Sequence, residues 1–119
     1  EEELRTKGFL YMEVIQACTG TIVVADKEEA LQIAFDLYNR RIDEKIPSTP
    51  TLFALMLKAC KLLPPSANEQ MMSLSKQVFE SACSDGLVNN HVLSELKRVN
   101  YHLFQAYEKK PEHVAGIRN

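Results

Sequence analysis

The chain has 119 residues, of which 45% are apolar and 25% charged, and its net charge is −2 at pH 7. This composition is ordinary for one soluble globular domain with a real core, and no stretch approaches the roughly 18 uninterrupted apolar residues of a membrane helix. The basic excess typical of a dedicated nucleic-acid-binding surface is also missing.

The first apolar segment, residues 9–18, predicts a helix that follows a lead-in segment over residues 1–8. Because the chain opens with three glutamates and no Met, we expect an excised or processed piece. A β-branched run follows over residues 21–24. With no partner strand in sight, this run predicts an extended loop that packs inward.

Asp26 and Glu29 stand in capping-box register and predict the start of a second helix. Apolar residues then recur at spacings of three and four, which indicates one buried helix face ending near Lys45. The residues of this stripe are Ala30, Leu31, Ala34, Leu37, Tyr38 and Ile42.

Thr49 as N-cap and Pro50 in the first turn predict a third helix. Residues 52–63 are apolar nearly all round, so we expect this helix to be central and buried, and Pro64-Pro65 to stop it.

Ser66 and Glu69 form a capping box for a fourth helix, which Gly86 should end in the left-handed conformation. Asn90 should cap a fifth helix that continues to Tyr107, and residues 108–119 are predicted to be a tail. The apolar stripe of the fourth helix is Met71, Leu74, Val78 and Ala82, flanked by Phe79 and Cys83.

The chain nearly repeats itself. Residues 15–18 are matched by residues 57–60 at an offset of 42, and residues 37–38 by residues 78–79 at an offset of 41. A fixed period of this size is typical of stacked helical hairpins, each too small to bury its own apolar face. We therefore predict an all-α, right-handed α-solenoid of about five helices over residues 9–107. Repeat 1 spans about 9–48, repeat 2 about 49–89, and a half repeat 90–107.

The junctions at residues 44–53 and 85–94 resemble those of the pentatricopeptide repeats, in which the pattern is Gly-aliphatic-Pro-x-Asp/Asn. In this chain, Lys45 and Val88 replace the usual Gly and Pro. Residues 28–38 and 77–80 are similar to the second helix of that family. The resemblance covers roughly residues 9–96. The period here is longer than the family's, with the excess in residues 19–26 and 64–69, and loops at a solenoid edge accept such insertions cheaply.

This resemblance implies single-stranded RNA binding at one base per repeat, in a mitochondrion or plastid. It pairs Met12 with Thr49 and Ala54 with Asn90 as base-reading positions. Met12 and Ala54 cannot hydrogen-bond a base edge, and we expect these two residues to be helix contacts and Thr49 and Asn90 to be N-caps. The candidate partner or RNA contacts are Tyr11, Met12, Thr49, Phe53, Ala54, Lys58, Lys61 and Asn90.

Nothing in the sequence indicates catalysis. His91, His102 and His113 are 11 residues apart, a spacing that places no two on one helix face for metal binding. The three cysteines form no metal or disulfide motif, which favours reduced thiols inside the cell. We expect no enzyme activity, no cofactor or metal, no small-molecule substrate and no membrane association.

The favoured function is therefore a non-catalytic docking scaffold for a protein partner or neighbouring repeats. The alternatives are single-stranded RNA binding as part of a longer array, and a structural subunit of a large organellar complex. The unfinished half repeat predicts an open end face that something must cover. Its residues are Val92, Leu96, Val99, Leu103 and Tyr107.

Overall fold

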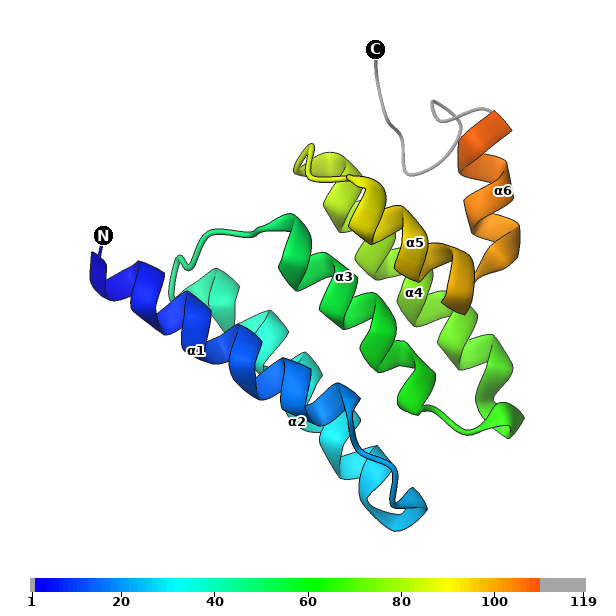
Figure 1. Cartoon of the computed structure of the whole chain (residues 1–119), viewed down its shortest axis with the longest axis horizontal. Helices are drawn as coiled ribbons and strands as arrows, with labels where there is room; N and C mark the ends of the chain where they lie inside the picture. The colour runs from blue at the N-terminus through cyan, green and yellow to red at the C-terminus, as the bar shows by residue number, and fades with distance from the viewer. Residues whose placement is uncertain (1, 110–119) are drawn as a thin grey trace.

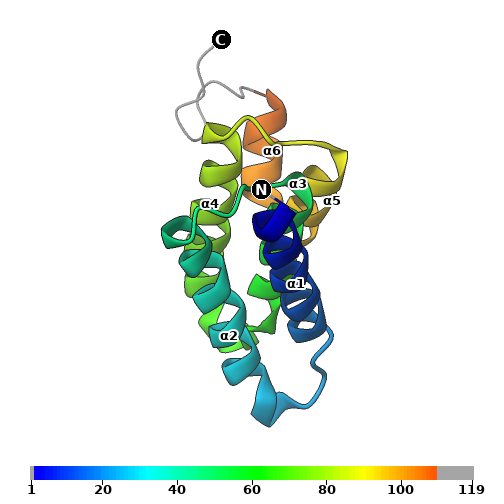
Figure 2. The same cartoon turned by 90° about the vertical axis from the view of Figure 1, so that its left-hand side faces the viewer.

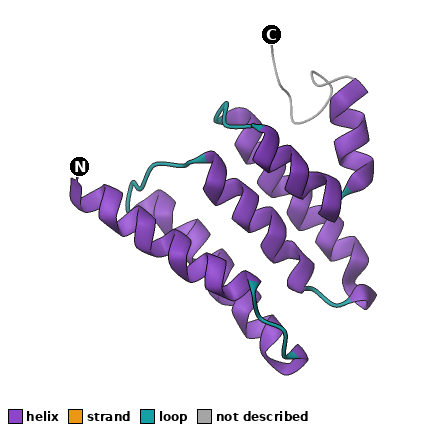
Figure 3. Ribbon diagram, viewed as in Figure 1, coloured by secondary structure: helices purple, strands orange, loops and turns teal. Residues whose placement is uncertain are grey.

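A computed structural model describes residues 2–109, and this part of the chain is helical, without a strand (Figure 3). The all-α prediction is confirmed. Two short 3-10 turns, η1 (Cys60–Leu62) and η2 (Pro65–Ala67), join α3 to α4. The α-helices are α1 (Glu2–Thr19), α2 (Val24–Asp43), α3 (Pro50–Ala59), α4 (Asn68–Ser84), α5 (Asn90–Val99) and α6 (Tyr101–Lys109).

The helices form two layers, with α1, α3 and α5 side by side in one layer and α2 and α4 in the other (Figures 1 and 2). The central helix, α3, contacts α1, α2, α4 and α5. Every residue from Leu52 to Leu57 is buried, which confirms the prediction of a central helix that is apolar nearly all round. The Thr49 hydroxyl accepts a hydrogen bond from the Leu52 N–H at 3.2 Å, so the predicted N-cap is also confirmed.

The ends of α2 and α4 repeat the same geometry at an offset of 41. The Ile46 N–H donates to the Arg41 carbonyl at 2.9 Å, and the Leu87 N–H donates to the Ala82 carbonyl at 2.9 Å. The residue before each, Lys45 or Gly86, has a positive φ, of 57° and 68°. These are Schellman-type ends, in which a left-handed residue lets the chain turn back and satisfy the last carbonyls of the helix. The sequence repeat thus corresponds to a repeat of backbone hydrogen bonds.

The predicted starts of the first two helices are wrong. α1 begins at Glu2, so residues 2–8 belong to the helix and are not a lead-in segment. α2 begins at Val24, two residues before Asp26, and its N-cap Val23 makes no side-chain hydrogen bond. Asp26 instead lies in the first turn, where its charge is favourable to the helix dipole. Ile22, Val23 and Val24 are exposed, so this β-branched run does not pack inward.

The starts of α4 and α5 also differ from the prediction. α4 follows η2 directly with Ala67 at its N-cap, so Ser66 forms no capping box. The N-cap of α5 is Asn89, whose side-chain oxygen accepts from the Val92 N–H at 2.9 Å. Asn90 is the first residue of the helix. Two adjacent asparagines have the same capping chemistry, so the sequence pattern could not separate them.

The predicted fifth helix is two helices, which makes six α-helices in the described residues. Asn100 ends α5, and its side-chain oxygen accepts from the Leu103 N–H at 3.2 Å to cap α6. Its side-chain nitrogen donates to the Ser75 hydroxyl at 3.1 Å and to the Met72 carbonyl at 3.4 Å, both in α4. This buried amide therefore fixes both the break and the position of α6.

Asn100→Ala should lower the free energy of unfolding by about 2 kcal/mol, because it removes the buried hydrogen bonds to α4 and leaves the N-terminus of α6 without its cap. Urea unfolding of the variant and the parent chain measures this loss. Asn89→Ala, which removes an exposed cap only, should cost about 1 kcal/mol. Equal losses in the two variants would contradict the assignment of a buried network to Asn100.

Lys45→Gly should stabilise the chain by about 1 kcal/mol, since glycine adopts the positive φ of this position without a Cβ penalty. Gly86→Ala is the matched control at the equivalent position and should destabilise by a similar amount, although a Cβ there meets no atom within 4 Å. Thermal unfolding of both variants checks the opposite signs. A loss of stability in Lys45→Gly would contradict the left-handed geometry.

Candidate interaction site

The predicted partner or RNA contacts do not form one surface. Phe53 and Ala54 are buried, so neither can contact a ligand in this fold. Met12 and Thr49 are partly buried and lie together, with the Thr49 hydroxyl 3.5 Å from the Met12 sulfur. The predicted contacts that are fully exposed are Lys58, Lys61 and Asn90.

Tyr11, the remaining predicted contact, belongs to a small polar cluster at the junction of α1 and α2. Its hydroxyl donates a hydrogen bond to the Glu44 carboxylate at 2.6 Å, and Lys7 lies 3.4 Å from the same oxygen. The hydrogen bond stabilises the ionised carboxylate, so it lowers the pKa of Glu44. It also raises the pKa of Tyr11, because the bonded phenol gives up its proton less readily.

Tyr11→Phe should move the pKa of Glu44 upward, because the largest cause of its depression is removed. A depressed carboxyl pKa contributes stability that is present above the pKa of the unfolded chain and is lost as pH falls through the folded pKa. The variant should therefore lose less stability on acidification. NMR titration of the Glu44 side chain measures this shift. An unchanged Glu44 pKa would show that the hydrogen bond does not persist in solution.

The predicted end face is largely covered by the chain itself. Val92, Leu96 and Val99 are buried in the core that α5 shares with α3. Leu103 and Tyr107 are partly buried in α6, with the Tyr107 ring 5.1 Å from the Phe79 ring in an edge-on contact. These residues do not form an open face, because α5 packs on α3 and the turn at Asn100 brings α6 against α4.

The open apolar surface lies at the other edge, on α1. Phe9, Leu10 and Val14 are exposed there, with Leu10 at 55% and Val14 at 45% of their full accessible areas. We name Leu10, Val14 and Ala17 the α1 face, whereas Phe9 lies at the cavity between α1 and the α2–α3 junction. Phe9, Leu10 and Val14 belong to the apolar segment predicted over residues 9–18, and that prediction did not separate the buried side of the helix from its exposed side. The spacing of Leu10, Val14 and Ala17 is the signal that could have identified a second helical stripe.

A cavity of about 440 Å³ opens between the start of α1, the end of α2 and the start of α3. Its walls are mostly apolar and include Met12, Leu37 and Ile46. Gly8 also lines this cavity. A Cβ at that position would lie 3.0 Å from the Ile46 side chain. The close approach of α1 to the α2–α3 junction therefore depends on glycine.

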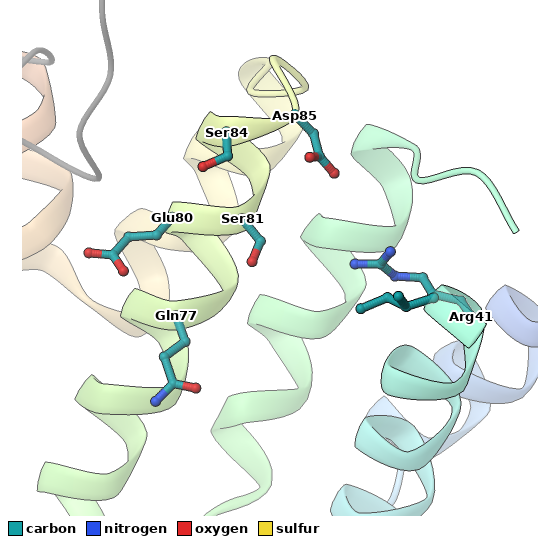
Figure 4. A pocket seen from close by; sticks show the side chains of 7 residues that line it. Arg41, Gln77, Glu80, Ser81, Ser84 and Asp85 are labelled. Carbon is teal, nitrogen blue, oxygen red and sulfur yellow. The ribbon is translucent and has the colours of Figure 1, made fainter. Parts of the chain in front are cut away.

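A polar groove of about 700 Å³ runs between α2 and α4 (Figure 4). Its main feature is Arg41, which is only 8% exposed. The guanidinium carbon lies 4.5 Å from the centre of the Tyr38 ring and 5.6 Å from that of Phe53. Among the described residues, the Arg41 Nε finds no hydrogen-bond partner. The other residues that line the groove are Ile42, Gln77, Glu80, Ser81, Ser84 and Asp85.

The buried position of Arg41 differs from the predicted stripe of the second helix, which contained Ile42. Ile42 is exposed, whereas Arg41 is inside. Ala34, Tyr38 and Arg41 follow spacings of four and three, so the stripe itself pointed to position 41. A charged residue, Arg41, at a position of this buried stripe was the feature of the sequence that could have identified the groove.

The potential reactive and metal-binding residues offer no site. Burial raises the pKa of Cys60 to about 12 and that of Cys83 to about 11, so both thiols are protonated near neutral pH. His91 and His102 are exposed, and His113 lies outside the described residues. Between residues 2 and 109, no three His, Cys, Asp or Glu side chains gather as metal ligands would. No helix in that range combines the length and hydropathy needed to cross a bilayer.

Compared with family models, with curated proteins and with solved structures, the chain shows no significant match.

Proposed function

We propose that this chain is a non-catalytic helical-repeat docking module, of pentatricopeptide-repeat-like architecture, whose α1 face binds a helical hairpin of a protein partner. The observation that carries the proposal is the exposure of apolar residues on α1 at positions where the next repeat buries them. The proposal includes the solenoid arrangement of the two hairpins, which the repeated hydrogen bonds at Lys45 and Gly86 support.

The internal repeat indicates that the α1 face is a surface on which another helix could pack. At an offset of 42, Leu10 corresponds to Leu52 and Val14 to Met56, and both α3 residues are buried. Helix α3 is flanked by α1 on one side and by α5 on the other (Figure 1). Within residues 2–109, helix α1 has an equivalent neighbour on one side only, so its other side resembles an unoccupied stacking surface.

The repeat also indicates the occupant. One of the two helices that pack beside α3 in this layer is α1, which is the first helix of a hairpin. A partner for the α1 face should therefore be a helical hairpin with an apolar stripe of its own. Glu3 and Glu13 lie exposed on α1, so basic residues at the rim of the partner would complement them.

Several observations favour protein over RNA. Phe53, which the resemblance places beside a base-reading position, is buried and cannot stack on a base. The exposed glutamates of α1 and the net charge of −2 oppose a polyanion. The α1 face itself is apolar, which suits a helix better than a phosphate backbone.

Site-specific photo-crosslinking tests this function. A photoreactive amino acid replaces Leu10 in one variant and exposed Lys76 of α4 in the control, and both are incubated in extract of the cells that make the protein. The expected result is a protein crosslink at position 10 that maps to an amphipathic helix, is absent at position 76 and disappears when Val14→Lys is added. Electrophoretic shift with random single-stranded RNA at two salt concentrations is run in parallel.

The opposing outcomes are distinct. Equal crosslinking at both positions, or none at position 10, would contradict docking on the α1 face. Crosslinking of the chain to itself, with a dimer by light scattering, would replace the partner by a second copy. A tight RNA shift that weakens steeply with salt would favour the RNA-binding alternative.

A further inference from the structure

The polar groove between α2 and α4 holds a cationic side chain, Arg41, that forms no ion pair with a described residue. Arg41 is more than nine-tenths buried, and no hydrogen bond or ion pair joins its side chain to another described residue. Figure 4 shows its guanidinium directed away from α2 into the groove, toward the side on which Ser81 and Asp85 lie. Buried charges in proteins are normally paired, so this arrangement is unusual.

The aromatic rings around Arg41 explain its position but not its charge. Tyr38 and Phe53 contact the guanidinium through their faces, which offsets part of the cost of removing it from water. A ring accepts none of the directional N–H bonds that a guanidinium offers. Nε is buried without a partner, and Figure 4 shows the terminal end of the guanidinium directed into the groove, where it could meet a planar oxyanion end-on.

The remaining walls restrict the anion. Ser81 and Ser84 supply hydroxyls and Gln77 an amide, all capable of donating to an oxygen. Glu80 and Asp85 add negative charge to the same groove. These two carboxylates would repel a polyphosphate or a nucleic-acid backbone. A ligand with one carboxylate next to one cationic group could instead pair its carboxylate with Arg41 and its cation with a carboxylate of the groove.

We infer that this groove is a binding site for an acidic side chain of a peptide segment, in which a carboxylate docks on the terminal nitrogens of Arg41 and a neighbouring basic residue meets Asp85. The site lies on the α2–α4 layer, so it does not depend on the α1 face. It recognises an acidic-basic sequence pair such as Glu-Lys.

NMR of the full chain labelled with 15N-arginine tests this site. The probe is a blocked peptide, acetyl-Ala-Glu-Lys-Ala-amide, and the control peptide carries Gln in place of Glu. The expected result is a saturable shift of the Arg41 side-chain resonance by the Glu peptide, while the Gln peptide binds at least tenfold more weakly. The signal of exposed Arg40, one residue earlier on α2, should not move.

Variants separate recognition from folding. Arg41→Met should abolish binding of the Glu peptide and keep or raise the melting temperature, since an unpaired buried charge is removed. Arg41→Lys keeps the charge without the planar fork and should weaken binding about tenfold. Arg40→Met is the matched control and should bind like the parent. Asp85→Asn should weaken the Glu-Lys peptide and leave a peptide with Glu alone unaffected or tighter.

Three results would overturn the inference. If no probe moves the Arg41 resonance, the residue serves cation–π packing only. If inorganic phosphate binds as tightly as the Glu peptide, the groove is a general anion site and not a peptide site. If Arg40→Met loses binding as Arg41→Met does, the peptide binds the surface of α2 and not the groove. None of these outcomes affects the crosslinking test of the α1 face.

Discussion

Leu96→Asp is expected to unfold the chain at room temperature. Leu96 is fully buried in α5, within the core that this helix shares with α3. Loss of the leucine side chain costs about 2–5 kcal/mol, and an ionised carboxylate buried without a partner adds several more. This sum is comparable to the whole stability of a small domain, about 5–15 kcal/mol. Circular dichroism at 222 nm should show loss of helix before any heating.

Lys97→Asp is the control for this experiment. Lys97 is the next residue of α5 and is exposed, so the same carboxylate there stays in water. Its replacement should change the free energy of unfolding by less than about 0.5 kcal/mol. A folded Leu96→Asp variant with an unchanged melting temperature would show that α5 does not pack on α3 in solution. Helical but concentration-dependent behaviour would show that a second chain covers the charge.

The core of the fold could be predicted from the sequence because periodicity reports burial directly. The apolar residues of 52–63 and the stripe from Ala30 to Tyr38 both identify buried helix faces that the structure contains. The offset of 41 at Ile46 and Leu87 marks two equivalent helix ends with identical backbone hydrogen bonds. The Thr49 cap was predictable from local capping chemistry, although the same chemistry misplaced the caps of α2, α4 and α5.

The features that were not predictable depend on contacts distant in sequence. The break at Asn100 is invisible in the pattern because Val99, Leu103 and Tyr107 keep helical spacing across it. Only Ser75 and Met72, on another helix, explain why Asn100 turns the chain. Likewise, the exposed side of α1 can be recognised only after α3 and α2 have taken the inner side. A sequence shows which residues are apolar but not how many neighbours a helix has.

Phe53→Ala is expected to destabilise the chain by about 3–5 kcal/mol, as a large aromatic side chain is removed from a closed core. Phe53 is fully buried, and its ring lies 6.2 Å from that of Tyr38 at an interplanar angle of 76°. The substitution also removes one of the two rings that contact Arg41, which leaves the buried guanidinium less compensated. Urea unfolding monitored by circular dichroism measures the loss.

The neighbouring residue Thr51 gives the control, since it lies on the same helix and is exposed. Thr51→Ala should change stability by less than about 0.5 kcal/mol. The comparison also separates the two roles that Phe53 could have. A core residue loses stability on truncation, whereas a surface aromatic that stacks on RNA bases would lose binding and keep its stability. A stable Phe53→Ala variant would therefore contradict the buried position and reopen the RNA-binding alternative.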